Sequence, residues 1–344
     1  SLYDRTCGSL QTTLLLFMIE RFGMLNSSFL PPLRRVVLVG TSVPRRCGIA
    51  TFTDDLHRAL SLRNATLDVS VIAMNDCENK YDYPDHVAFE IHQDNPAAYA
   101  VAADFLGVSD TDIVCLQHEF GIFGGPAGEN VLKLLEGLTA PLVTTLHTIL
   151  EKPDSNQLKV MHALITRSTR LVVMAEKGRK ILGDVYGVPY EKVAVIPHGV
   201  PDRAFLDPAL AKHEFDLADR TLLMTFGLLG PGKGIETAIQ ALPFLIRAHP
   251  KILYMIVGAT HPNLLNSEGE RYRESLVSLA DTLGVGAHVQ FIDRYLSLDD
   301  LLKYLAACDI YVSPYPNEAQ IVSGTLAYAL ALGKPIVSTP FWYA

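Results

Sequence analysis

Residues 310–338 read IYVSPYPNEAQIVSGTLAYALALGKPIVS and set an apolar run, a polar loop and a helix of small residues in direct succession. The run suits a buried parallel strand, which the two prolines after it end. The helix is predicted to begin at Ser323-Gly324-Thr325, with Ser323 as its N-cap, and to bury Leu326 and Leu330 on one face. Backbone N–H groups at such a helix start can hold a phosphate. An ordinary capped helix fits the same residues, so the segment predicts the fold class and leaves the phosphate site open.

Short β-branched runs of the same kind alternate with helical patterns along the rest of the chain. They lie at 36–39, 69–72, 113–116, 142–145, 171–173 and 193–196 in the first half, and at 222–224, 252–257, 288–292, 310–312 and 336–338 in the second. Such alternation indicates parallel sheets wrapped by helices. The predicted architecture is therefore α/β, with two doubly wound Rossmann-like domains facing each other across a cleft.

The domain boundaries follow from a break at 197–199, after which prolines and a polar stretch interrupt the alternation. Residues 33–200 are predicted to form the N-terminal domain, 201–219 the linker and 220–344 the C-terminal domain. Residues 1–32 are interpreted as an N-terminal appendage, because their apolar run is too short for a signal peptide or a membrane span. Ligands of doubly wound sheets bind at the carboxyl ends of strands, so functional residues are expected there.

The composition excludes several classes of partner. Lys and Arg number 29 against 37 Asp and Glu, and the net charge of -8 argues against nucleic acid or an acidic membrane surface as the main partner. Peripheral membrane contact stays open. The five cysteines are odd in number and form no CxxC pair, which argues against disulfides and zinc and favours a reducing cytoplasm.

The loop after the first strand leads through Gly48 into a predicted helix. Gly48 would let the backbone approach a ligand closely. Arg45 and Arg46 are interpreted as a solvated pair, with direct phosphate contact as the alternative. The loop lacks the GxGxxG fingerprint, and no acidic residue ends the second strand to hold a ribose, so a nicotinamide dehydrogenase is disfavoured.

Two histidines end neighbouring strands of the first domain: His118, followed by Glu119, and His147. Both are predicted to point toward the same cleft, where a pair of histidines favours a functional role over a structural one. His118-Glu119 does not begin an HExxH motif, and the chain has no GxSxG elbow. We therefore expect neither a metal site nor a Ser-His-Asp hydrolase.

The second domain opens with a glycine-rich loop that carries one lysine, FGLLGPGKG at 226–234. Lys233 precedes a predicted helix, and a cation at that positive end is unfavourable unless an anion binds there. Lys233 is therefore predicted to contact a phosphate, with a simple surface charge as the alternative. The spacing is not that of Walker A, because Gly234 follows the lysine.

Taken in order, the Gly48 loop, His147 and the segments 197–200, 230–234, 256–258 and 310–338 resemble a retaining glycosyltransferase of family 4 (glycosyl transferases group 1) with the GT-B architecture. The resemblance spans residues 34–344. It implies a hexosyltransferase-type enzyme that moves a sugar from a nucleoside-diphosphate sugar in the second domain to an acceptor hydroxyl, held mainly in the first domain. Family members usually work without a bound metal, so the resemblance implies no metal and no other cofactor.

The resemblance also implies roles for individual residues. Lys233 would bind the donor diphosphate, and Ser323-Gly324-Thr325 would contact the donor sugar and phosphate. His147 would contact the donor sugar at the reaction centre, which makes His147 and Lys233 the catalytic candidates, and Gly48 would close over the phosphates. His118-Glu119 is the candidate for the acceptor side of the cleft.

The chain departs from the family pattern at two places. Leu228 stands where the family commonly has an arginine, so one cation for the diphosphate is missing. Gln320 and Tyr328 stand where it commonly has two glutamates. Gln320 is predicted to bind sugar hydroxyls of the donor, and Tyr328 to reach a ribose. Three arginines are candidates for supplying the absent charge: Arg294, Arg271 and Arg273.

Other functions stay open at this point. A sugar phosphorylase or a nucleotide-sugar epimerase of the same architecture would use free phosphate or water in place of the acceptor. A non-catalytic nucleotide-sugar-binding protein would tolerate the lost arginine and glutamates. The chain stops just after a strand, where the family continues with further helices, so the second domain is expected to be incomplete.

Overall fold

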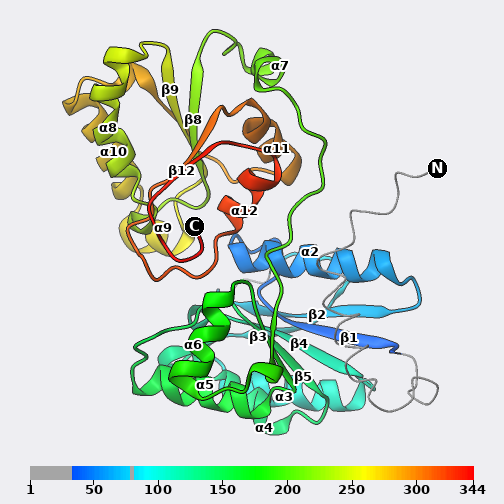
Figure 1. Ribbon diagram of the computed structural model, residues 1–344. Helices are drawn as coiled ribbons and strands as arrows, with labels where there is room; N and C mark the ends of the chain where they lie inside the picture. The colour runs from blue at the N-terminus through cyan, green and yellow to red at the C-terminus, as the bar shows by residue number, and fades with distance from the viewer. Residues whose placement is uncertain (1–32, 78–80) are drawn as a thin grey trace. The chain divides into compact units, whose positions relative to one another are not determined.

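The computed structural model describes residues 33–77 and 81–344, and the predicted appendage at 1–32 lies outside them. The described residues form two compact units, one ending at Gly199 and the other running from Val200 to Ala344 (Figure 1). Each unit is a parallel sheet with helices on both of its faces. This confirms the predicted α/β class with two Rossmann-like domains.

The first sheet has the strand order β3-β2-β1-β4-β5-β6-β7. Its strands are β1 Arg35–Gly40, β2 Asp68–Asn75, β3 Val87–His92, β4 Ile113–His118, β5 Leu142–Leu146, β6 Arg170–Val173 and β7 Val193–Val195. Six of these strands contain the predicted apolar runs. The sequence did not predict β3, because this edge strand fully buries only Ile91 and so carries no apolar run.

The helices of the first unit are α2 Gly48–Arg63, α3 Pro96–Val108, α4 Val131–Gly137, α5 Ser155–Arg167 and α6 Glu176–Tyr186. Helix α2 covers one face of the sheet, and α3, α4 and α5 cover the other (Figure 1). Leu56 and Leu60 of α2 pack with Val36 and Leu38 of β1, as their spacing of four residues predicts. This packing holds the start of α2 near the carboxyl ends of the strands.

The second sheet has the order β10-β9-β8-β11-β12. Its strands are β8 Thr221–Phe226, β9 Ile252–Val257, β10 Val289–Ile292, β11 Ile310–Ser313 and β12 Ile336–Ser338, and its helices are α7 Pro208–Ala211, α8 Ile235–Ala248, α9 Pro262–Glu268, α10 Arg271–Thr282, α11 Leu298–Ala307 and α12 Gly324–Ala331. Helices α8 and α10 lie on one face and α11 and α12 on the other (Figure 1). Ile235, Ile239 and Leu242 of α8 are fully buried.

Burial in α12 differs from the prediction. Leu326 is buried, but the side chain of Leu330 is 57% exposed. The buried residues of the helix run consecutively from Leu326 to Ala329. Burial therefore follows position along this short helix, whose middle is enclosed, rather than one face, and the predicted burial of Leu330 is wrong.

Part of the predicted linker at 201–219 belongs to the second unit. Ala211 of α7 is buried in the same apolar cluster as Leu305 of α11. The next residue, Lys212, is also buried, and its Nζ lies 2.6 Å from Asp309 Oδ2. The polar composition of this stretch concealed the ion pair of a buried lysine.

Replacing Asp309 by alanine is expected to destabilise the second unit by about 3 kcal/mol, because Lys212 would keep a buried charge without its partner. The carboxylate also accepts a hydrogen bond from the backbone N–H of Leu222 at the start of β8. Thermal denaturation of the full chain checks the prediction. Asp184→Ala, which breaks an exposed pair with Lys180, serves as the control and should change little. Equal melting curves for the two variants would contradict the prediction.

Candidate functional site

The loop that carries Lys233 is shaped by glycines. It turns through a 3₁₀ segment, Pro231–Lys233, before α8 begins at Ile235. Gly234 between them has φ +62°, and a Cβ there would lie 2.0 Å from the carbonyl oxygen of Pro314. Only glycine permits that approach, and it brings Lys233 to the residues that follow β11. Lys233 therefore lies just before the helix start, as predicted.

Around Lys233 the structure joins segments that are far apart in the sequence. Its Nζ donates a hydrogen bond to the Tyr315 hydroxyl at 2.9 Å and lies 4.5 Å from the centre of that ring. The Tyr315 hydroxyl is 2.8 Å from Thr325 Oγ1, which is 3.2 Å from Ser323 Oγ. Ser323 also caps α12, accepting from the backbone N–H of Leu326 at 3.3 Å. We call Lys233, Tyr315, Ser323 and Thr325 the lysine cluster.

The N-terminus of α12 is part of the lysine cluster. Gly324 and Thr325 are its first two residues, and the first turn of a helix leaves backbone N–H groups without partners inside the helix. Those groups and the Lys233 ammonium all favour an anion at the same place. The predicted N-cap role of Ser323 is confirmed.

Tyr315 is the residue of this site that the sequence analysis missed. It is buried, and burial alone raises the pKa of its hydroxyl, but the Lys233 charge and hydrogen bond outweigh this and lower the pKa below its ordinary value. The phenol therefore interacts strongly with the ammonium group. Its place two residues after β11 is the one sequence signal that could have identified it.

The arginines expected to replace the missing charge do not join the lysine cluster. Arg294 is exposed beyond the end of β10 and donates to the Tyr304 hydroxyl at 3.3 Å. Arg273 is buried and paired with the carboxylates of Glu270, at 3.1 Å, and Asp293, at 2.5 Å. Arg271 lies exposed at the start of α10. Within residues 200–344, Lys233 is thus the one cation that the lysine cluster contains.

Two further predicted donor residues have other surroundings. Tyr328 is only 6% exposed and lies in the apolar core of the second unit beside Phe226, so the structure gives no support to the ribose contact. Gln320 donates from its side chain to the carbonyl of Val322 at 3.0 Å and thereby shapes the loop before α12. Their roles were inferred from the positions of two family glutamates, a pattern that this chain does not keep.

In the first unit, His147 follows β5 and is held on several sides. Its Nε2 lies 3.1 Å from Oε1 of Gln117 in β4, and its backbone N–H donates to the carbonyl of His118 at 3.0 Å. Phe52 of α2 meets the ring edge-on, with centroids 4.9 Å apart. Burial and the neighbouring His198 and His118 lower the pKa of His147 to about 3. The imidazole is therefore neutral and fixed in orientation.

The sequence analysis predicted that His118 points toward a cleft, but its side chain is enclosed. It has no exposed surface, lies between Phe120 and Phe123, and neither of its ring nitrogens has a hydrogen-bond partner. Burial lowers its pKa to about 3. The polar residues at the end of β4 are both enclosed, because Gln117 and His118 are each 0% exposed, and the sequence alone could not show this.

Glu119 is bound to the residue that follows His147. The hydroxyl of that residue, Thr148, donates a hydrogen bond to Glu119 Oε2. The other carboxylate oxygen accepts from the backbone N–H of Phe120 at 3.0 Å. Burial raises the pKa of the Glu119 carboxyl above its ordinary value, although these two hydrogen bonds lower it. Both carboxylate oxygens thus hold the loop after β4, which is a structural use of this acceptor candidate.

The loop before α2 is built differently from the prediction. Arg45 is buried, donating to the carbonyl of Met74 at 2.9 Å and lying 3.1 Å from Asp76, so it is not a solvated residue. Its long-range partners could not be read from the sequence. Cys47 caps α2 by accepting from Ala50 N at 3.3 Å. Gly48 is exposed as the first residue of α2, and a Cβ there would meet no atom within 4 Å.

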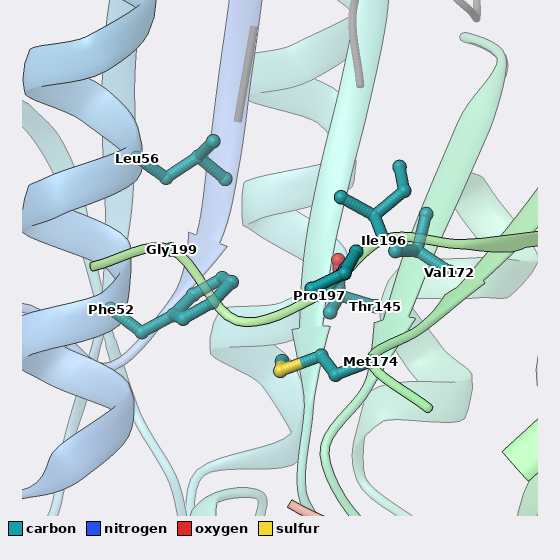
Figure 2. Close-up of a pocket in the computed structure, with 8 residues that line it drawn as sticks. All are labelled: Phe52, Leu56, Thr145, Val172, Met174, Ile196, Pro197 and Gly199. Atoms are coloured by element: carbon teal, nitrogen blue, oxygen red, sulfur yellow. The ribbon is translucent and has the colours of Figure 1, made fainter. Parts of the chain in front are cut away.

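Under α2 lies an apolar cavity of about 20 Å³ (Figure 2). Phe52 and Leu56 line it from the helix, and Thr145 and Val172 line it from the sheet. It has room for about one water molecule and is too small for a sugar. Across residues 33–77 and 81–344, no three His, Cys, Asp or Glu side chains gather as a metal site would require, and none of the helices described there could span a bilayer.

Solved structures of GT-B proteins share this fold. The crystal structure of Anabaena Alr3699/HepE in complex with UDP and glucose matches with a TM-score of 0.65 at 16% identity, over 88% of this chain and 80% of that one. WaaG, a glycosyltransferase involved in lipopolysaccharide biosynthesis, matches with a TM-score of 0.63 at 19% identity, over 90% of this chain and 82% of that one. The class of protein is therefore GT-B.

Family models identify the family within that class. The model described as Glycosyltransferase Family 4 matches residues 47–203, and the model described as Glycosyl transferases group 1 matches residues 220–342. The first match covers most of the first unit and ends at residue 203, just inside the second, and the second match lies within the second unit. The chain belongs to the family 4 glycosyltransferases (glycosyl transferases group 1), as its motifs predicted.

Curated relatives match over parts of the chain. D-inositol 3-phosphate glycosyltransferase of Segniliparus rotundus is 27% identical over 216 residues, which is 58% of this chain and 46% of the relative. GDP-mannose-dependent alpha-(1-6)-phosphatidylinositol monomannoside mannosyltransferase of Mycobacterium tuberculosis is 30% identical over 130 residues, 37% of this chain and 31% of the relative. The chain thus spans about half the length of the first relative, or less.

Proposed function

We propose that the protein is a retaining, hexosyltransferase-type glycosyltransferase that moves a sugar from a nucleoside-diphosphate sugar to an acceptor hydroxyl without a bound metal. The lysine cluster at the start of α12 is the observation that carries the proposal. It places an ammonium group, three hydroxyl groups and a helix N-terminus together, and all of them can bind phosphate oxygens. The names of the relatives, one of which is GDP-mannose-dependent, support a nucleotide-sugar donor.

Stabilisation of the leaving diphosphate is the chemical task of this site. As the glycosidic bond stretches, negative charge builds on the diphosphate, and fixed donors that face this charge lower the barrier. Lys233 and the α12 N-terminus would supply them, so a divalent cation is not needed for that task.

The proposed route to retention uses the diphosphate itself. Gln320 and Tyr328 leave no carboxylate at the two positions where the family commonly has glutamates. We therefore assign the acceptor's proton to a diphosphate oxygen. The bond from the anomeric carbon to the diphosphate breaks, the bond to the acceptor oxygen forms on the same face of the sugar, and the proton passes to the leaving group.

The proposal extends to the cellular location of the protein and to its substrates. The partners are the nucleotide sugar and a sugar or other hydroxyl acceptor. A cytoplasmic location fits the reduced thiols of Cys47, Cys77, Cys115 and Cys308, the cysteines in the described part of the chain.

A donor screen on the full chain tests the proposal. Titration with UDP, GDP and ADP compounds should give heat and thermal protection with at least one nucleotide, and the matching sugar should pass to an acceptor with its anomeric configuration kept and with no loss on adding EDTA. Binding without turnover over an acceptor panel would replace the proposal with a binding protein. Transfer to free phosphate would indicate a phosphorylase, and absence of any binding would end the proposal.

A further inference from the structure

We propose that Tyr315 is a positioning residue that holds the Lys233 ammonium group at the first turn of α12, so that the cation and the helix N-terminus act on the same diphosphate. The diphosphate as the ligand rests on the proposed function. The hold on Lys233 does not, because the contact is present in the free protein.

The Lys233 side chain is restrained by one residue in two ways. A lysine side chain is flexible, and Lys233 extends from a glycine-rich loop. Among residues 33–77 and 81–344, no carboxylate forms an ion pair with Lys233, and its Nζ donates to the Tyr315 hydroxyl at 2.9 Å instead. The same Nζ lies 4.5 Å from the centre of the Tyr315 ring, which is a cation–π distance. Tyr315 therefore restricts the ammonium group through both its hydroxyl and its ring.

The backbone after β8 lies against the same ammonium group. Gly227 directly follows β8, and a Cβ there would lie 3.5 Å from Lys233 Nζ and 3.4 Å from Thr325 Cγ2. Thr325 is the second residue of α12. The tip of the lysine and the first turn of α12 therefore meet over the same stretch of backbone.

The directions of the hydrogen bonds tie the lysine to α12. An ammonium group can only donate, so the Tyr315 oxygen accepts from Lys233. The hydrogen of the phenol then remains available for Thr325 Oγ1, which is 2.8 Å away. The Tyr315 hydroxyl thus bridges Lys233 and the first turn of α12, and removing it breaks both contacts at once.

Tyr315 is itself fixed, as a positioning residue must be. It is only 2% exposed, and its ring packs on Phe341 with the centroids 5.1 Å apart and 26° between the planes. Its backbone carbonyl accepts a hydrogen bond from Thr339 Oγ1 at 2.6 Å. A phenylalanine at position 315 would keep the ring and backbone contacts, so Tyr315→Phe removes the hydroxyl alone.

Calorimetric titration of the full chain with inorganic pyrophosphate tests the role of the hydroxyl. Tyr315→Phe should bind pyrophosphate about tenfold more weakly than the wild type, the loss expected for one hydrogen bond to a charged group. In the Lys233→Met background, Tyr315→Phe should have no further effect, because Tyr315 acts through the lysine. The matched control is Tyr304→Phe, which removes the hydroxyl of another buried tyrosine of the same unit and should bind like the wild type.

The outcomes separate this proposal from the proposed function. An equal loss of affinity with and without Lys233 would show that the hydroxyl does not act through the lysine, and would overturn the proposal while leaving diphosphate binding in place. Wild-type affinity in Tyr315→Phe would overturn it in the same way. If the wild-type chain bound neither pyrophosphate nor any nucleoside diphosphate, the proposed function would fail as well.

Carbon NMR of the full chain labelled with ¹³C at tyrosine Cζ tests the contact without a ligand. Burial raises the pKa of the Tyr315 hydroxyl, but the Lys233 charge and hydrogen bond lower this pKa below its ordinary value. Tyr311 and Tyr254 are the other titratable groups that act on it, and they stay uncharged because burial raises the pKa of both. One signal, absent in Tyr315→Phe, should therefore titrate below the ordinary tyrosine pKa in the wild type and above it in Lys233→Met.

An unchanged titration in Lys233→Met would mean that Lys233 and Tyr315 are not in contact, and would overturn the proposal whether or not the protein transfers sugar. If Tyr315→Phe fails to fold, the comparison of the wild type with Lys233→Met still decides, because one tyrosine signal is expected to move between them.

Discussion

Replacing Lys233 by alanine is expected to lower the rate of sugar transfer about a hundred- to a thousand-fold, or about 3 kcal/mol of transition-state stabilisation. Lys233 is the one cation in the lysine cluster, since Arg273 is neutralised by two carboxylates and Arg294 lies elsewhere. Leu228 stands in place of the family's arginine, and the lysine cluster holds no second cation among residues 200–344. Initial rates at saturating donor and acceptor measure the effect.

The control for this experiment is Lys303→Ala, which removes an exposed lysine of α11 in the same unit. It should transfer sugar at the wild-type rate. Lys233→Ala should keep the wild-type melting temperature, because the lysine lies in a loop and donates its hydrogen bond to a single hydroxyl, that of Tyr315. A Lys233→Ala protein that transfers at the wild-type rate would remove Lys233 from the mechanism and leave the lysine cluster as a structural feature.

The fold could be predicted because most strands are buried on both faces. Strand β9 is buried at all six positions, so its apolar run is visible in any window of the sequence. Strand β3 lies at the sheet edge and mixes exposed with buried positions, which makes it resemble a loop. The burial of the stretch around Lys212 was not predicted, because a polar residue is expected to be exposed. A lysine that is buried with its partner cannot be distinguished from a solvated one by residue type.

The candidate site was predicted where a residue's role depends on its local place. Ser323 caps α12 as its position before a helical run requires, and Lys233 precedes α8. Tyr315 was missed because its role depends on Gly234, which lets two distant segments touch. His118 and Arg45 were assigned the wrong surroundings, since their burial depends on residues of other strands and loops. Roles that depend on neighbouring residues can be predicted from the sequence, whereas burial by distant segments cannot.

Replacing His147 by alanine is expected to lower kcat about 10- to 100-fold while affinity for the nucleoside diphosphate changes less than about twofold. The two effects separate because the groups proposed to bind the phosphates belong to the second unit, whereas His147 belongs to the first. The loss corresponds to about 1.5 to 3 kcal/mol, the range for a hydrogen bond that meets developing charge. Single-turnover rates and calorimetric titration with the nucleotide measure the two quantities.

The matched control is His162→Ala, an exposed histidine on α5, which should leave both quantities unchanged. The pH profile adds a second check. Because the pKa of His147 is about 3, its ring stays neutral from about pH 5 to pH 9, so the wild-type kcat should show no ionisation that disappears in His147→Ala. An ionisation near neutral pH that the variant loses would mean that His147 works as a proton-transfer group. Loss of nucleotide affinity with kcat unchanged would place His147 at the diphosphate instead, against the assignment to the donor sugar.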